Sequence, residues 1–263
     1  MTRVIAVANQ KGGVGKTTTS VNLSASLAMT GSRLLLIDLD PQGNATMGSG
    51  VEKSNLELSI YHWLMEARPL ANVTQHCSGG YEIMPANTDL TAAEVELLSQ
   101  KQREHRLKQR LRAEARDLDY VIIDCPPSLN ILTVNALIAA DGVLIPMQCE
   151  YYALEGLTAL LDTIERVREQ ANPSLAIEGL LRTMYDPRNS LTRDVSRQLI
   201  QYFGDTVFRT VIPRNVRLAE APSHGLPAIL YDRQSRGAVA YMALAGELRR
   251  KHQTSEQSAE NGE

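Results

Sequence analysis

A glycine-rich segment near the start of the chain carries residues suited to phosphate chemistry. It reads QKGGVGKTT at residues 10–18 and directly follows an apolar run at residues 4–9. Glycine can take positive φ, so successive N–H groups can point inward and form a nest for an anion. A helix beginning at Thr17 would add the partial positive charge of its N-terminus. This order of strand, glycine loop and helix predicts a phosphate-binding loop.

Two side chains of this loop have defined tasks in such a site. Lys16 can reach the β- and γ-phosphates of a nucleotide, and the Thr17 hydroxyl can ligate Mg²⁺. The alternative is a glycine turn that only links a strand to a helix, and the sequence Gly-Lys-Thr after a strand argues against it. The other residues expected at the nucleotide are Gly12, Gly13, Val14, Gly15 and Thr18.

Three aspartates stand at or just beyond the ends of apolar runs. Asp38 and Asp40 end the run that begins at Leu34, and Asp124 lies near the end of the run at 120–125. Ligands of open α/β sheets bind at the carboxyl ends of strands, and alternation places Asp38 and Asp40 on one side. One of these two can hold Mg²⁺ through water while the other orients the attacking water, and their spacing does not decide which. Asp124 ends an apolar strand in the Walker B manner and would anchor the water shell of the metal. Read singly, each could instead be a turn or capping aspartate.

The rest of the chain alternates between strand and helix patterns. Apolar runs predict strands at residues 4–9, 34–38, 81–86, 120–125, 142–148, 177–185 and 207–213. Helical patterns cover residues 17–30, 91 to about 116, 154–170, 192–203 and 235–251. We read Thr91 and Glu94 as a capping box that opens the second helix. This order predicts one doubly wound, mostly parallel α/β sheet with helices on both faces, over residues 1–251. The polar tail at residues 252–263 is expected to be disordered.

Composition excludes several classes of protein. The formal net charge is -3, so any nucleic acid must bind at a local basic patch. The 3 cysteines, Cys77, Cys125 and Cys149, have no CxxC spacing and suit neither a disulfide framework nor a zinc site. Neither a signal peptide nor an apolar run of membrane-spanning length is apparent, so we expect a cytoplasmic protein without a membrane anchor.

Basic residues concentrate in two parts of the chain. One run, residues 101–112, falls on the predicted second helix, where Leu107, Leu111 and Ala115 would form the inward stripe. Its charges are read as a solvated face or as part of a surface for a partner. The other group is Arg182, Arg188, Arg193, Arg197, Arg209, Arg214 and Arg217. For any one of these arginines a solvated surface is the more common role.

The phosphate loop departs from the usual pattern in a way that points to a family. Gln10 stands where the first glycine is usual, and a second lysine, Lys11, follows it. The loop resembles the deviant Walker A pattern KGGxGK[ST] of the ParA/Soj partition ATPases, MinD, the nitrogenase iron protein and the arsenite-pump ATPase. The resemblance implies that Lys11 crosses a dimer interface to the phosphates bound by the partner. A cation supplied there would stabilise the charge that spreads over the γ-phosphate during transfer.

Three further segments resemble the short, chromosomal type of ParA/Soj protein. They are DLDPQGNAT at 38–46, DCPPS at 124–128 and IPRNVRLAEAPSHG at 212–225. A MinD-like protein would need a basic, amphipathic C-terminal anchor, and the iron protein would need cysteines that meet across the dimer axis. The start of the loop at residue 10 implies the form without an additional N-terminal DNA-binding domain.

The resemblance also implies roles for single residues. Lys11, Lys16 and Asp40 would be catalytic, with Asp40 positioning water. Thr17, Asp38 and Asp124 would lie at Mg²⁺, Pro213 and Asn215 at the adenine of ATP, and Arg188 and Arg217 on DNA.

The implied function is DNA segregation. ATP would drive a sandwich homodimer that binds double-stranded DNA without sequence preference on the nucleoid, and a ParB-type partner would stimulate hydrolysis. Two alternatives remain, which are a related ATPase that positions a protein cargo and a metabolic ATP-dependent enzyme on the same fold, such as a carboxylase-type synthetase.

Overall fold

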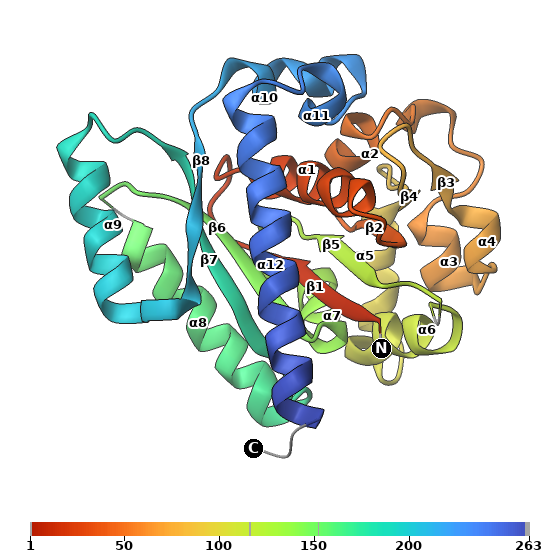
Figure 1. Ribbon diagram of the computed structural model, residues 1–263. Coiled ribbons are helices and arrows are strands. Elements are labelled where there is room, and N and C mark those ends of the chain that lie inside the picture. Colours follow the sequence, from red (N-terminus) through yellow and green to blue (C-terminus); the bar gives the residue numbers. More distant parts are fainter. Residues whose placement is uncertain (1, 116, 152, 261–263) are drawn as a thin grey trace.

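The fold is built on one twisted sheet, seen in a computed structural model that describes residues 2–115, 117–151 and 153–260 (Figure 1). Within these residues the sheet has 8 strands in the order β3-β4-β2-β5-β1-β6-β7-β8. All neighbouring pairs are parallel except β3 with β4. The strands are β1 Arg3–Val7, β2 Leu34–Asp38, β3 Gln75–His76, β4 Glu82–Met84, β5 Tyr120–Asp124, β6 Gly142–Gln148, β7 Ala176–Tyr185 and β8 Val207–Pro213. The doubly wound, mostly parallel sheet predicted from the sequence is confirmed.

Helices cover both faces of this sheet, because its strands are apolar on both sides. One face carries α1 Lys16–Met29, α2 Asn44–Gly48, α10 Val216–Glu220, α11 Ala228–Tyr231 and α12 Arg236–Glu260. The other face carries α3 Ile60–Glu66, α4 Leu70–Val73, α5 Leu90–Leu98, α6 Arg106–Glu114, α7 Ile131–Ala139, α8 Ala153–Gln170 and α9 Ser190–Phe203. Short 3-10 turns lie at Lys53–Asn55, Arg103–His105, Gly204–Thr206 and Ala221–His224. Along β1, Ile5 and Val7 pack towards α1 and α12, while Ala6 packs into the core on the opposite face.

The long helix predicted from residue 91 to about 116 is wrong. The segment forms two helices, α5 and α6, separated by a turn in which Gln102 has φ 55°. A left-handed residue cannot continue an α-helix. A tertiary partner stabilises the break, because the side chain of Asn135 on α7 accepts from Leu107 N at 3.1 Å and donates to Arg103 O at 2.8 Å. The predicted inward stripe at Leu107, Leu111 and Ala115 is buried as expected.

The predicted start of that helix is also wrong. The helix begins at Leu90 after Asp89, so Thr91 is not its N-cap and forms no capping box with Glu94. Glu94 instead accepts from Asn130 Nδ2 at 2.7 Å, at the start of α7. The short helices α2, α3, α4, α10 and α11, and the apolar helix α7, were not predicted.

The last helix of the chain is longer than the sequence pattern predicted. Helix α12 continues to Glu260, past the boundary predicted at residue 251, and His252 contacts both Tyr120 Oη at 3.2 Å and Glu178 Oε1 at 3.0 Å. Residues 261–263 of the predicted tail lie outside the described residues. Across the described residues, we find no helix that combines the length and the apolar character needed to cross a membrane.

Candidate nucleotide-binding site

The glycine loop joins the end of β1 to the start of α1, in the order predicted from the sequence. Gly13 and Gly15 have φ 74° and 90°, a region that favours glycine. The loop is tied to the sheet behind it, because Thr183 Oγ1 on β7 donates to Val14 O at 2.7 Å. Asn9 fixes the start of the loop by accepting from Lys11 N at 2.9 Å and donating to Pro146 O at 2.8 Å. The backbone is therefore held in its turn before any ligand binds.

Lys16 lies inside this loop as the first residue of α1. It is only 7% exposed, and its Nζ donates to Lys11 O at 3.2 Å. Burial lowers the pKa of Lys16, and the charges of Asp124 and Asp40 act in the opposite direction. A buried ammonium with one long hydrogen bond to a carbonyl has donors left for a phosphate.

Asp38 and Asp124 are direct neighbours in the β2–β5 register, and both are fully buried. Asp124 accepts from Thr17 Oγ1 and from Ser20 Oγ, each at 2.8 Å. Burial raises the pKa of both carboxyls, and the charge of Asp38 adds to the rise at Asp124. Two buried carboxylates side by side are unfavourable unless a cation compensates them. The site therefore fits Mg²⁺ beside Thr17 and Asp124.

The described residues contain no group of three or more His, Cys, Asp or Glu side chains able to hold a metal. A magnesium site does not require such a group, because Mg²⁺ uses one or two protein ligands together with phosphate oxygens and waters.

Asp38 and Asp40 differ in what they face, which their spacing alone could not decide. Asp38 accepts from Thr46 N and Thr46 Oγ1, each at 2.7 Å, and from Asp40 N at 3.2 Å. It thereby shapes the loop that carries Asp40. Asp40 accepts from Gln42 N at 2.9 Å and lines the cavity above the glycine loop. Of the two carboxylates, Asp40 is the one that lines this cavity, and its role in positioning water stays a prediction.

The cavity has a volume of about 450 Å³ and brings together seven of the predicted site residues. These are Gly12, Gly13, Gly15, Lys16, Thr17, Thr18 and Asp40. Pro213 and Asn215 do not line it, and Asn215 Oδ1 instead accepts from Leu218 N at 3.3 Å as the N-cap of α10. Pro222 and Leu226, further along the same segment, line it instead. The contact of Pro213 and Asn215 with adenine stays a prediction.

Met184 also lines the cavity and was missed from the sequence. It lies in β7 with φ 48°, which is rare for a residue with a side chain, and Gln148 Nε2 approaches its Sδ at 2.6 Å. Such strain concentrates at functional sites. No sequence signal could have found it, because a methionine inside the strand predicted at residues 177–185 is read as a core residue.

Three further predicted residues, Lys11, Arg188 and Arg217, lie on the surface. Lys11 is exposed, and its Nζ lies 2.7 Å from Glu150 Oε2. Arg188 forms two hydrogen bonds with Asp186, at 2.9 and 2.7 Å, and Arg217 pairs with Glu220 at 2.8 Å. Arg182, counted in the basic group from the sequence, is buried and cannot belong to a surface patch. Its guanidinium donates to Ser196 Oγ and Phe208 O, each at 2.8 Å.

Fold and loop together define the class, a P-loop nucleoside triphosphatase with a second lysine in its loop. A family model described as an AAA domain matches residues 2–177. The sporulation initiation inhibitor protein Soj of Bacillus subtilis is 53% identical, over 94% of this chain and 98% of that protein. The chromosome partitioning protein ParA of Myxococcus xanthus is 52% identical, over 95% of this chain and 88% of that protein. The chain belongs to the ParA/Soj family of ATPases.

A solved structure shows how closely the fold is shared. The cobyrinic acid a,c-diamide synthase of Mycobacterium smegmatis, with bound ADP and magnesium, has a TM-score of 0.86 and 40% identity over 97% of each chain.

Proposed function

We propose that this protein is a DNA-segregation ATPase of the bacterial cytoplasm that acts on the nucleoid. ATP with Mg²⁺ would drive a sandwich homodimer, the dimer would bind DNA without sequence preference, and a ParB-type partner would stimulate hydrolysis. The observation that carries the proposal is the likeness to Soj and ParA over 94% and 95% of the chain. It extends past residue 177, where the match to the family model ends, into the part that holds Arg188 and Arg217.

The geometry of the loop supports the hydrolysis step. Lys16 would hold the β- and γ-phosphates, since its ammonium lies within the loop. Bound Mg²⁺ would supply charge neutralisation at the phosphates, next to Thr17 and Asp124. Asp40 would orient the water in line with the γ-phosphate. No group in this constellation forms a covalent bond to the substrate, as is usual for phosphoryl transfer by positioning and charge.

The two lysines of the loop support the dimer. Lys16 is buried inside the loop, whereas Lys11 is exposed and directed to Glu150 at the surface. A lysine side chain in this exposed position is better placed to contact the phosphates bound by a second copy than those bound by its own chain. Dimerisation would also bring two sets of Arg188 and Arg217 onto one duplex, which raises the number of phosphates neutralised.

A gel-shift series with two unrelated duplexes tests the proposal. We expect firm binding of both duplexes with ATP and Mg²⁺, weak binding without nucleotide, and a dimer by light scattering only with ATP. Lys16→Ala should lose ATP hydrolysis and ATP-dependent DNA binding together. Equal binding with and without ATP, or a monomer in both states, would count against a segregation cycle.

The fold match with the diamide synthase keeps a metabolic enzyme as a second candidate. Such an enzyme should hydrolyse ATP only when its small substrate is present, and DNA should have no effect. A protein-positioning ATPase would keep ATP-dependent DNA binding but respond to a different partner. Hydrolysis assayed with DNA, with a ParB-type protein and with neither separates the three.

A further inference from the structure

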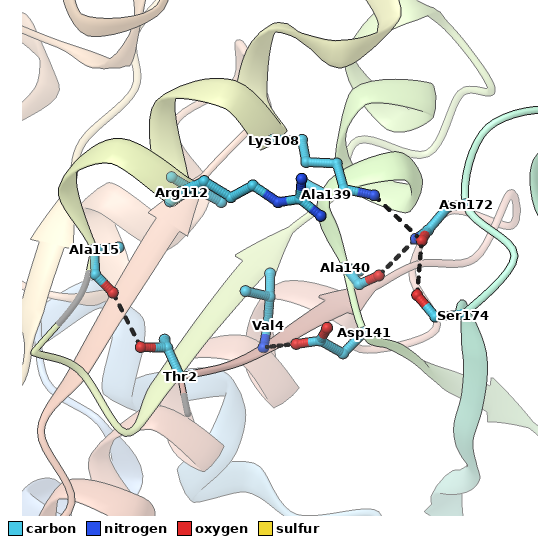
Figure 2. Close-up of a pocket in the computed structure, with 11 residues that line it drawn as sticks. Thr2, Val4, Lys108, Arg112, Ala115, Ala139, Ala140, Asp141, Asn172 and Ser174 are labelled. Atoms are coloured by element: carbon cyan, nitrogen blue, oxygen red, sulfur yellow. Dashed lines mark hydrogen bonds between the residues drawn. The ribbon is translucent and has the colours of Figure 1, made fainter.

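A second cavity lies at the opposite edge of the sheet from the glycine loop. Its volume is about 330 Å³, and it is bounded by α6, the start of β1 and the turns that precede β6 and β7 (Figure 2). Val4, Asp141 and Ser174 mark these strand starts, whereas the nucleotide site lies where the strands end. No residue that the structure describes lines both cavities. Whatever binds here therefore does not compete with the nucleotide for space.

Two cations from consecutive turns of α6, Lys108 and Arg112, line this cavity. Lys108 Nζ makes a long hydrogen bond of 3.3 Å to Asn172 Oδ1. The side chain of Arg112 has no hydrogen bond or ion pair to any other described residue. Like charges four residues apart on a helix destabilise it, and burial together with the charge of Arg112 lowers the pKa of Lys108. An anion beside both cations would remove this repulsion.

The other arginines of α6 show that this arrangement is specific to one side of the helix. Arg106 donates to Leu64 O at 3.0 Å, and Arg110 pairs with Glu114 at 2.8 Å and lies over the ring of Trp63. These two charges are used within the fold. Lys108 and Arg112 point the other way, where they also border an adjacent hollow of about 350 Å³ with His105 and Gln109.

The rest of the lining indicates the kind of anion. Among the described residues of the lining Asp141 is the one acid, and its Oδ2 accepts from Val4 N at 2.8 Å. With Lys108 and Arg112 it leaves one net positive charge among these three groups, which suits a singly charged ligand better than a phosphate dianion. The rest of the wall is apolar at Val4, Leu111, Ala115, Ala139 and Ala140, and polar at Thr2, Asn172 and Ser174.

We propose that this cavity binds a carboxylate that carries a short apolar chain, with Lys108 and Arg112 as its counter-charges. The ligand is either a small free carboxylic acid or the carboxylate side chain of a peptide. In both cases the carboxylate lies against the two cations, and its apolar part lies against Val4, Ala139 and Ala140. The volume is sufficient for a group of this size.

The test uses the full chain labelled with ¹⁵N and follows the amide signals of Val4, Ala139 and Ala140 at constant ionic strength. The two carboxylate probes are butyrate and the α-amide of N-acetylglutamate, which keeps its side-chain carboxylate. Butyramide and inorganic phosphate are the comparisons. We expect saturable shifts at these three amides with the carboxylates and none with butyramide. Tighter binding of butyrate identifies the free acid as the source, and tighter binding of the glutamate derivative identifies a peptide.

Variants decide whether the cations carry the binding. Arg112→Gln and Lys108→Gln should each weaken it by about tenfold, equal to about 1.4 kcal/mol, and Arg112→Lys should recover most of the loss. Lys101→Gln, an exposed lysine outside the cavity lining, is the matched control and should change nothing. Arg112→Gln removes no hydrogen bond or ion pair of the described residues and relieves the repulsion with Lys108, so its thermal unfolding temperature should equal or slightly exceed that of the wild type. The proposal is overturned if the amide shifts do not saturate, or if butyramide causes equal shifts or phosphate stronger ones. It is also overturned if the shifts persist in both Arg112→Gln and Lys108→Gln.

Discussion

Lys11 Nζ lies 2.7 Å from Glu150 Oε2, so the second lysine of the phosphate loop is held by a carboxylate of its own chain. The main-chain oxygen of Lys11 meanwhile accepts a hydrogen bond from Lys16 Nζ at 3.2 Å. The backbone of Lys11 therefore belongs to the loop, whereas its side chain belongs to the surface. An ion pair between half-exposed groups contributes only about 0.2–1 kcal/mol, so the side chain can leave Glu150 at little cost.

This division of roles leads to a prediction for Lys11→Ala. The variant should bind ATP with nearly wild-type affinity, because its side chain does not line the cavity. It should stay monomeric with ATP, because the cation offered to a second copy is gone. Light scattering during gel filtration measures the mass, and ATP binding is measured in parallel. Lys101→Ala is the control. Loss of ATP binding itself in Lys11→Ala would show that the lysine acts within its own chain.

A second prediction concerns the carboxylate that faces the cavity. Asp40→Ala should reduce hydrolysis by about 100-fold or more, the usual effect of losing a group that positions or deprotonates water. Binding of ATP should be retained, so an ATP-bound dimer should accumulate. Single-turnover hydrolysis with gel filtration measures both effects. Asp205→Ala removes an exposed acid far along the chain and should be neutral. Normal turnover in Asp40→Ala would move the water-positioning role elsewhere.

Local pattern was sufficient to predict the sheet and the loop, and contact between distant segments explains what it missed. The apolar runs gave all the central strands, because strands buried on both faces have no polar alternation. The break between α5 and α6 depends on Asn135, which lies about thirty residues further on and caps the second helix. The hydroxyl of Thr46 also connects distant segments, because it donates to Asp38 at 2.7 Å and accepts from Ala86 N at 2.9 Å.

The end of α12 follows the same rule. The polar composition of residues 252–263 gave no reason to expect a helix there. In the structure His252 contacts Glu178 on β7 and Tyr120 on β5. Met184 has no local signature at all, because its backbone conformation depends on the packing around the end of β7. Such positions require the structure.

The buried carboxylate of Glu178 leads to a prediction on acid stability. Burial alone would raise its pKa, but the hydrogen bond and charge of His252 and the ion pair with Arg3 at 3.0 Å lower it to about 2. A carboxyl whose pKa is lower in the folded than in the unfolded chain stabilises the folded state at pH values above its ordinary pKa of 4.5. This contribution to stability is lost as the pH falls towards 2. Its size is at most about 3 kcal/mol.

Glu178→Gln should therefore lower the free energy of unfolding at pH 7, and its difference from the wild type should shrink between pH 4.5 and pH 2. Urea unfolding at several pH values measures this. Glu165→Gln, which loses only an exposed pair with Arg168, is the control and should run parallel to the wild type. A difference that stays constant down to the lowest pH would show that the ion pairs of Glu178 contribute nothing.

The last prediction concerns the arginines proposed to contact DNA. The side chain of Arg188 is 89% exposed, yet both hydrogen bonds of its guanidinium go to Asp186. These hydrogen bonds lower the pKa of the Asp186 carboxyl to about 2. Asp186 is charged at neutral pH, as an aspartate of ordinary pKa also is, and it competes with DNA phosphate for the guanidinium. Asp186→Asn removes one negative charge and frees Arg188, so it should strengthen DNA binding in the ATP state. Arg188→Ala should weaken it.

The salt dependence distinguishes this explanation from a general change in charge. Each phosphate contact contributes about 0.9 to the slope of log K against log salt. Arg188→Ala should flatten the slope by about one for each subunit in contact, whereas Asp186→Asn should keep the contact and raise affinity most at low salt. Asp194→Asn, which frees Arg197 on α9 in the same way, is the matched control. Gel shifts with two unrelated duplexes at several salt concentrations supply the slopes. If Asp186→Asn and Asp194→Asn strengthen binding equally, net charge explains the effect and Arg188 has no special place on the DNA.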